Sequence, residues 1–275
     1  MVSDPNITAA QPDHTLGQYR AWRLSGGAVA PFDLAWISIA RDQSPAAHRL
    51  LPHGEPSIAV MRKRDADGEI NDVSLKVCGP YYKTDHYRPK PREELIALRL
   101  KPEICAALFN IAPREYANDA TTQAPAALYN ACAKTLDHAA SASTADILLL
   151  LTSDLSRFVA SHGVNTGPET IAAQWMRDME GSIQFRHIAQ KLEVSERNLR
   201  RRFTDHVGCS PKAYARRLQI TAASLAAERS AKPDWAAISA EAGFHDQPHM
   251  INVFKTEIGL TPSALHAERR ALLAA

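Results

Sequence analysis

Residues 195–203 read SERNLRRRF and hold four arginines within six positions. Leu199 and Phe203 stand among them four residues apart, which places both on one face of an α-helix. Guanidinium groups on the opposite face could bind guanine bases, because arginine donates paired hydrogen bonds to guanine O6 and N7. The alternatives are therefore a solvated, charged helix surface and a helix that enters a groove of nucleic acid.

The four arginines do not all point the same way on such a helix. Each residue advances by about 100°, so Arg197, Arg200 and Arg201 share the side opposite the two apolar residues. These three are the predicted base-reading residues. Arg202 lies on the other flank and is predicted to contact phosphate or an acidic neighbour.

The elements that must position these arginines form a repeat with an offset of 51 residues. One copy reads SERNLRRRFTDHVGCSP from Ser195, and the other reads DQPHMINVFKTEIGLTP from Asp246. Each copy has a capping residue, two apolar residues four apart, a glycine that can end the helix and a proline that can start the next one. Short apolar-periodic segments, FRHIAQKLEV and WAAISAEAGF, precede the copies, which predicts two helix-turn-helix units. PKAYARRLQITAASLAAER predicts one long helix between them.

Positive charge is concentrated on the first unit. The whole chain has 32 basic and 30 acidic residues, a net charge of +2. Residues 195–217 alone hold seven basic and two acidic residues, a local charge of +5. This distribution is the one expected of a phosphate-binding surface.

The second copy has no arginine in its predicted recognition helix. Its predicted DNA-contacting residues are Gln247, His249, Ile251 and Asn252. Asparagine and glutamine can bind adenine through two hydrogen bonds, and isoleucine can pack against a thymine methyl group. The alternative is that this unit only positions the protein on DNA.

These segments resemble the AraC/XylS family of bacterial transcription regulators. The resemblance rests on IAQKLEVSERNLRRRF, GCSPKAYARRLQITAA and ISAEAGFHDQPHMINVFKTEIGLTP, about 80 residues in all. It implies a seven-helix DNA-binding domain whose two recognition helices enter successive major-groove segments on one face of the duplex. It also implies base reading at Arg197, Arg200 and Arg201. The chain departs from the family at Asn252, where a basic residue is common.

The first half of the chain has a strand-like pattern. FDLAWISI, PSIAVMRK, INDVSLKVCG and ELIALRL are short, apolar or β-branched, and separated by turn residues, which favours a small barrel or sandwich. Three helical segments follow. This half more weakly resembles a barrel-type domain found upstream of such DNA-binding domains, on LLPHGEPSIAV, Gly79-Pro80 and ALRLKPEICAALFNIAPREYAND. Such domains usually have proline-aspartate-glycine where this chain has Pro52-His53-Gly54.

The predicted fold is α+β: an N-terminal small, cupin-like β-barrel with helices, and a C-terminal all-α domain with two helix-turn-helix units. We predict a disordered N-terminus at 1–15, a β-rich sensor and dimerisation domain with C-terminal helices at 16–161, a linker at 162–170 and the DNA-binding domain at 171–275. The apolar stripe in SASTADILLLLTSDLSRFVASH favours packing of this helix onto the barrel, with a dimerisation helix as the alternative.

His53, Tyr81, Tyr82 and His86 are the candidate effector-binding residues, with simple loop packing as the alternative for the tyrosines. His48, His53 and His86 lie in the β-rich half, but no HxH or HxxxxE pattern accompanies them. No metal, cofactor or catalytic residue is therefore predicted. The four cysteines are far apart and form no CxxC pair, so buried thiols are expected.

The resulting prediction is a sequence-specific DNA-binding transcription regulator that is not an enzyme. Double-stranded DNA is the predicted partner, and RNA polymerase, a small-molecule effector and a second copy of the chain are further candidates. A metal-dependent cupin-like enzyme with a helical accessory domain is the alternative. No signal peptide or membrane span is predicted, so we expect a cytoplasmic, nucleoid-associated protein without a membrane partner.

Overall fold

The structure is a computed structural model of the 275-residue chain. It describes residues 8–9, 17–23, 32–40, 48–52, 55–87, 90–101, 104, 122–163 and 167–274.

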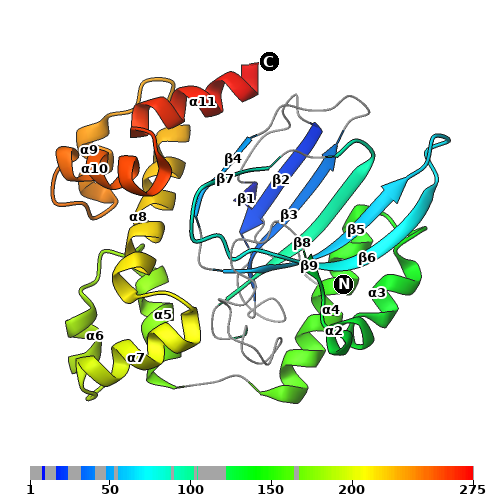
Figure 1. Cartoon of the computed structure of the whole chain (residues 1–275), viewed down its shortest axis with the longest axis horizontal. Helices are drawn as coiled ribbons and strands as arrows, with labels where there is room; N and C mark the ends of the chain where they lie inside the picture. Colours follow the sequence, from blue (N-terminus) through cyan, green and yellow to red (C-terminus); the bar gives the residue numbers. More distant parts are fainter. Residues whose placement is uncertain are drawn as a thin grey trace.

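An antiparallel sheet of seven strands forms the N-terminal domain (Figure 1). The strands follow the order β1-β2-β3-β8-β5-β6-β9 across the sheet. Their bounds are β1 Thr8–Ala9, β2 Gly17–Arg23, β3 Phe32–Ala40, β5 Ser57–Arg64, β6 Ile70–Cys78, β8 Glu93–Leu100 and β9 Thr122–Gln123. β4 (His48–Leu50) and β7 (Asp85–Tyr87) pair separately as a small two-stranded sheet.

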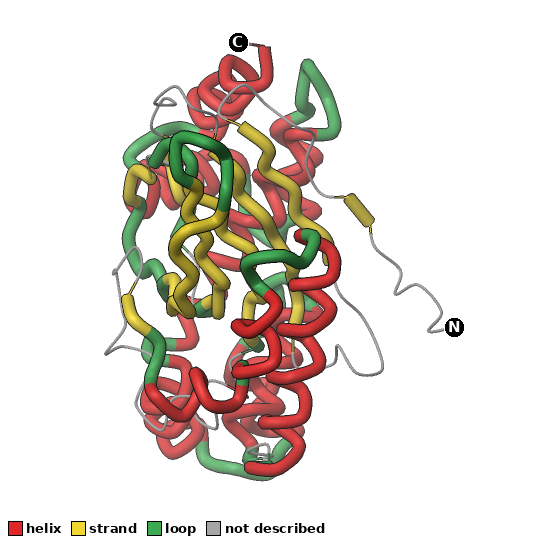
Figure 2. The backbone as a smooth tube through the Cα atoms, turned by 90° about the vertical axis from the view of Figure 1, so that its right-hand side faces the viewer, coloured by secondary structure: helices red, strands yellow, loops and turns green. Residues whose placement is uncertain are grey.

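Three helices cover one face of the seven-stranded sheet: α2 (Ala126–Ala131), α3 (Ala133–His138) and α4 (Thr144–His162). Ile147, Leu151 and Leu155 of α4 are fully buried in the same cluster as Ile58 of β5 and Ile96 of β8. The predicted packing of the α4 stripe onto the sheet is confirmed, because these positions recur at steps of three and four residues on one helix face. In the side view of Figure 2 the strands and these helices lie in front of the C-terminal helices.

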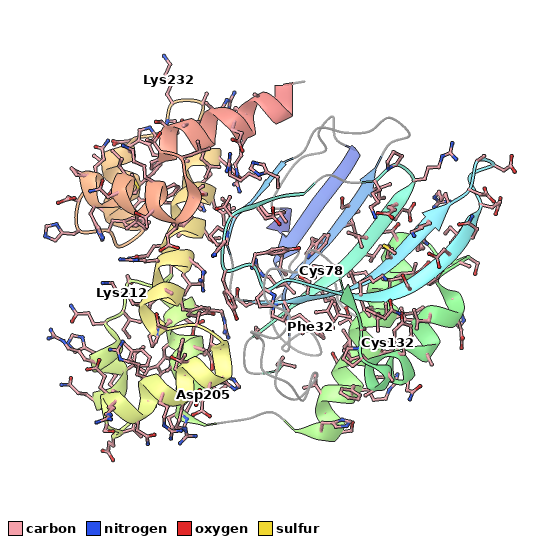
Figure 3. All side chains as sticks on the ribbon, in the orientation of Figure 1. Phe32, Cys78, Cys132, Asp205, Lys212 and Lys232 are labelled. Carbon is pink, nitrogen blue, oxygen red and sulfur yellow. The ribbon has the colours of Figure 1, made fainter. Side chains whose placement is uncertain are left out.

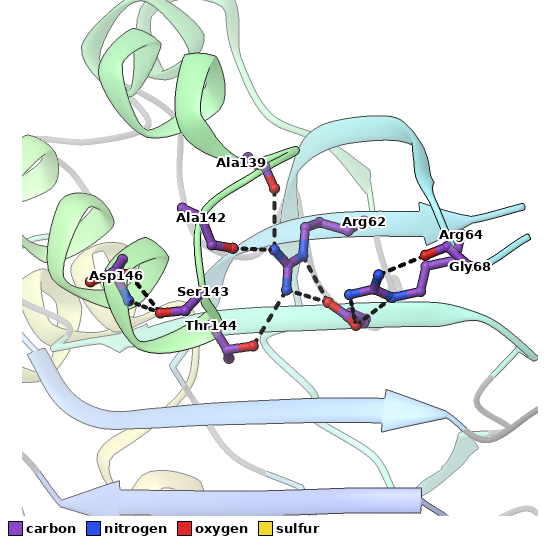
Figure 4. A network of polar contacts seen from close by, with 9 residues as sticks. Arg62, Arg64, Gly68, Ala139, Ala142, Ser143, Thr144 and Asp146 are labelled. Atoms are coloured by element: carbon purple, nitrogen blue, oxygen red, sulfur yellow. Dashed lines mark hydrogen bonds and ion pairs between the residues drawn. The ribbon is translucent and has the colours of Figure 1, made fainter.

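A buried arginine holds the turn between α3 and α4 against the sheet (Figure 4). Arg62 Nε donates to the Glu94 carboxylate at 2.7 Å, and its Nη1 donates to the carbonyl oxygens of Ala139 at 3.2 Å and Ala142 at 2.9 Å. Its Nη2 donates to Thr144 Oγ1 at 3.3 Å. A buried guanidinium needs such partners, because leaving its donors unpaired away from water costs free energy. The network therefore fixes the start of α4 relative to β5 and β8.

The C-terminal domain consists of seven helices within the described residues. α6 with α7 and α9 with α10 form the two predicted helix-turn-helix units, and α8 connects the two units (Figure 1). The bounds are α5 Pro168–Asp178, α6 Phe185–Lys191, α7 Glu196–Val207, α8 Pro211–Glu228, α9 Trp235–Glu241, α10 Gln247–Ile258 and α11 Pro262–Ala274.

The α+β class is confirmed, and three details differ from expectation. The pairings among the described strands form an open order and do not show closure into a barrel. Thr8 and Ala9, inside the segment predicted to be disordered, pair with β2; the rest of 1–15 lies outside the described residues. α5 begins at Pro168, inside the segment predicted as a linker, because Gly167 and Pro168 form a helix start with proline in the first turn.

Candidate nucleic-acid interface

The helix α7 has the caps and the buried face that its sequence predicts. The Ser195 hydroxyl accepts a hydrogen bond from the Asn198 backbone N–H, which satisfies one free donor of the first turn. Gly208 ends the helix in the left-handed conformation, at φ 82°. Leu199 and Phe203 are buried, and Phe203 packs edge-on against Tyr214 of α8. Phe203 also packs edge-on against Phe185 of α6, so α6 and α7 share one buried cluster.

Three of the four arginines lie on the solvent side of α7. Arg197 is exposed, and it forms no ion pair with any residue in the described part of the chain. Arg201 is 72% exposed at its side chain and donates to Asn198 Oδ1 at 3.3 Å. Arg200 pairs with Glu196 one turn earlier, and its guanidinium lies 5.6 Å from the centre of the Phe185 ring. All three heads are accessible from outside the domain.

Arg202 has a different partner. Its Nε lies 2.7 Å from the carboxylate of Glu169, a buried residue in the first turn of α5. The contact ties α7 to α5, and the two helices pack against each other. The structure thus places Arg202 beside an acidic neighbour, which is one of its two predicted contacts.

The predicted residues of the second unit lie together at the start of α10. The Asp246 side chain caps this helix by accepting from the His249 backbone N–H at 2.7 Å. That bond and the contact with His245 lower the pKa of the Asp246 carboxyl. Gln247, His249 and Asn252 are exposed and Ile251 is half-buried.

The ring of His249 is held in one orientation. Its Nδ1 lies 3.3 Å from the backbone nitrogen of His245. Because a backbone N–H can only donate, Nδ1 must be the acceptor, and the neutral ring then carries its hydrogen on Nε2. Phe244 packs edge-on against the same ring.

The two units contact each other as well as sharing α8. Arg216 of α8 pairs with Glu257 of α10, with Nη1 and Oε1 3.3 Å apart. Gln219 Nε2 donates to the Gly243 carbonyl at 2.8 Å. Gly243 has φ 74°, and a Cβ there would lie 2.8 Å from Cβ of Ser182, so only glycine allows this close approach.

A buried hydrogen bond joins the N-terminal domain to α8, and no sequence pattern indicated it. The hydroxyl of Tyr214 donates to Glu55 Oε1 at 2.6 Å, and both side chains are buried. Burial and the neighbouring Glu55 carboxylate raise the pKa of Tyr214, while Arg177 lowers it. The partners are 159 residues apart in the chain, so local periodicity could not have predicted their contact.

The candidate effector residues do not gather around one cavity in the described structure. Tyr81 is buried, and a Cβ at Gly79 would lie 3.0 Å from its ring. Tyr82 faces the C-terminal domain, where the guanidinium of Arg217 lies 4.7 Å from its ring centre. His86 is exposed on β7, and His53 lies outside the described residues.

A surface groove of about 410 Å³ lies beside α7. Phe185 and Ile183 are among its apolar lining residues, and Arg186, Arg200 and Lys212 add three cations. Lys212 stands in the first turn of α8 (Figure 3). A lysine in the first turn of α8, next to α7, is suited to bind a phosphate group.

The described cysteines are poor nucleophiles. Burial raises the pKa of the Cys78 thiol to about 12, as it does for Cys132, and raises that of Cys209 to about 11. Cys78 and Cys132 lie inside the N-terminal domain (Figure 3). Cys105 lies outside the described residues.

We therefore expect slow alkylation of these thiols in the folded protein. Because the thiolate is the reactive form, a pKa of about 11 leaves roughly one Cys209 thiol in a thousand ionised at about pH 8. A Cys105→Ser variant should react with a disulfide reagent at least about a hundredfold more slowly when folded than when unfolded in guanidinium chloride. The folded-state rate should rise with pH until about pH 11. Equal rates in the two states would contradict the burial of these thiols.

The described part of the chain shows neither a metal site nor a membrane-spanning helix. Among those residues, no group of three or more histidine, cysteine, aspartate or glutamate side chains is placed to hold a metal ion. None of the described helices combines the length and the apolar composition needed to span a bilayer.

Comparison with known proteins gives one family assignment. A helix-turn-helix domain model matches residues 188–268, the region that contains both predicted units. No curated protein sequence matches the chain.

Several solved structures are similar to parts of the chain. An AraC-type transcriptional regulator from Chromobacterium violaceum is 26% identical over 37% of this chain and 91% of its own, with a TM-score of 0.34. The DNA-binding domain of AdpA, solved with a target DNA, is 20% identical over 38% of this chain and 96% of its own, with a TM-score of 0.36. ToxT from Vibrio cholerae is 11% identical over 85% of this chain and 97% of its own, with a TM-score of 0.41. These overall superpositions are loose, so the assignment rests on the matched residues 188–268. Residues 188–268 of the chain therefore match the helix-turn-helix domain family.

Proposed function

We propose that the protein is a sequence-specific DNA-binding transcription regulator that places α7 and α10 in successive major-groove segments. The observation that carries this proposal is the outward face of α7, where three guanidinium groups stand on a capped helix of a helix-turn-helix unit. In such units the N-terminal residues of the second helix contact base edges. We propose that the protein binds DNA and catalyses no reaction.

The two units are proposed to read DNA by different chemistry. Arg197, Arg200 and Arg201 would donate to guanine O6 and N7, which favours a G-rich half-site. Arg200 would exchange its Glu196 partner for a base, since both side chains are exposed. On α10, the amides of Gln247 and Asn252 suit adenine and Ile251 suits a thymine methyl group. The outward Nε2–H of His249 suits a purine N7 or a phosphate oxygen.

The N-terminal domain is proposed to modulate DNA binding. Its direct contacts with α8 give a physical route for this modulation. A small molecule or protein that binds the N-terminal domain would change DNA affinity only if it binds two states of these contacts with different affinity. Dimerisation through the same domain and contact with RNA polymerase are further parts of the proposal. We place the protein in the cytoplasm, on the nucleoid.

A binding-site selection with the full-length protein on random duplex DNA tests this function. We expect two unequal half-sites about one helical turn apart, and an affinity that falls with salt as phosphate-bound counterions are released. Lys212→Ala should weaken binding to all sequences and reduce the salt slope by about one. Arg157→Ala, an exposed arginine on α4, is the control and should change neither. A lack of any sequence preference would refute the proposal.

A further inference from the structure

The N-terminal domain contacts the C-terminal ends of both recognition helices. The Tyr82 hydroxyl donates to the carbonyl of Val207, the last residue of α7, at 3.2 Å. Arg49 Nη1 lies 3.5 Å from the carbonyl of Ile258, the last residue of α10. Val207 and Ile258 are equivalent positions of the internal repeat, 51 residues apart. The last carbonyls of a helix have no partner within the helix, so they are free to accept these bonds.

A third donor strengthens the contact with α10. Thr84 Oγ1 donates to the Glu257 carbonyl at 2.9 Å. The Arg49 guanidinium also binds the Glu268 carboxylate of α11, with Nε to Oε1 at 3.0 Å and Nη2 to Oε2 at 3.2 Å. A cation at a helix C-terminus is favourable for the helix dipole as well. We call Arg49, Tyr82 and Thr84 the bridging residues.

The bridging residues belong to one small, paired piece of the N-terminal domain. Arg49 lies on β4 opposite His86 of β7. Thr84 immediately precedes β7, and Tyr82 lies two residues before Thr84. Figure 1 shows this two-stranded sheet between the large sheet and α8. The pairing of β4 with β7 connects Arg49 to the segment that carries Tyr82 and Thr84, so one part of the N-terminal domain supplies the donors to the ends of both α7 and α10.

We infer that the bridging residues position the two recognition helices relative to each other and thereby set the half-site spacing that the protein accepts. The inference rests on the proposed DNA-binding function. Each recognition helix presents its N-terminal end to the groove, so a bond at its C-terminal end controls the tilt and separation of the reading ends. One base pair of added spacing rotates a half-site by about 35° around the duplex, so a rigid pair of helices should discriminate strongly against it.

The test measures spacing preference, which a purely stabilising contact would leave unchanged. The selected site of the full-length protein is resynthesised with its spacer shortened or lengthened by one base pair, and Kd is measured by fluorescence anisotropy at one salt concentration. The variant is Tyr82→Phe with Thr84→Val, which removes two donors and keeps the ring on Arg217. The measured quantity is the Kd on the altered spacing divided by the Kd on the native spacing. We expect this ratio to be about tenfold smaller in the variant than in the wild type, roughly the effect of two lost hydrogen bonds.

A matched pair of substitutions within the N-terminal domain serves as the control. Tyr129→Phe with Thr152→Val removes two hydroxyl donors whose acceptors, Leu75 and Leu148, lie in the same domain. This control should keep the wild-type ratio, and Tyr82→Phe alone should give an intermediate one. An unchanged ratio in the bridging variant, whether or not all affinities drop together, would overturn the inference. A wild-type protein that selects no bipartite site would instead refute the proposed function.

Discussion

Replacing Arg201 with alanine is expected to leave the protein folded and bound to DNA while it loses its preference at one base pair. The side chain of Arg201 is largely exposed, and its partners Asn198 and Asp205 lie on the same helix surface. Its removal therefore leaves no buried group unpaired. A bidentate arginine–guanine contact contributes about 1–3 kcal/mol of discrimination, which corresponds to about 5- to 150-fold between the preferred base and its competitors.

The adjacent arginine provides the contrast. Arg202→Ala removes the ion pair with the buried Glu169, so it should lower the free energy of unfolding and leave base preference unchanged. Both variants are measured in the same two ways: affinity for single-base variants of the selected site, and the midpoint of urea unfolding. Should Arg202→Ala alter one base position while Arg201→Ala alters none, the assignment of the outward face of α7 would be wrong.

Replacing Glu55 with alanine is expected to destabilise the protein by about 3–5 kcal/mol, the cost of removing one partner from a buried charged contact. The substitution leaves the Tyr214 hydroxyl without its acceptor at 2.6 Å. It also removes negative charge from a site close to Tyr214, Arg177 and Cys209, as the pKa effects on Tyr214 and Cys209 show. Tyr214 stays buried, so its hydroxyl cannot regain a water partner.

Urea unfolding of the full chain measures this effect. Tyr214→Phe keeps the ring in its core and loses only the hydroxyl, so a smaller loss of about 1.5–3 kcal/mol is expected. Glu69→Ala changes an exposed glutamate in the β5–β6 turn and should stay within about 0.5 kcal/mol of wild type. If Glu55→Ala were as mild as Glu69→Ala, the contact between Glu55 and α8 would not contribute to stability.

The sequence predicted the C-terminal domain well because its determinants are local. A capping Ser195, an apolar pair at a step of four and a helix-ending Gly208 all act within one helix, and the same pattern recurs in α10. The N-terminal strands were also recognisable from their composition. The predicted barrel closure is not shown by the described strands. Closure depends on which distant strands pair, and alternating apolar residues carry no information about that partner.

Contacts between the domains could not be predicted for the same reason. Arg49 and Glu268 are 219 residues apart, and neither stands in a motif. Within the C-terminal domain, the angular position of Arg202 on α7 separated it from Arg197, Arg200 and Arg201 before its partner Glu169 was known. Helical geometry could therefore show that this side chain points elsewhere, but not which residue it meets.

In the proposed complex, the unequal chemistry of α7 and α10 would give one bound copy a polarity along the duplex. Three guanidinium groups face outward on α7, whereas the exposed candidates on α10 are uncharged amides and a histidine. If the protein bound in the reverse direction along the duplex, the arginines of α7 would lie over the half-site suited to the amides of α10. A single operator would then fix which way the chain points, and with it the side of the site on which the N-terminal domain lies. The protein could thus distinguish upstream from downstream without a second copy.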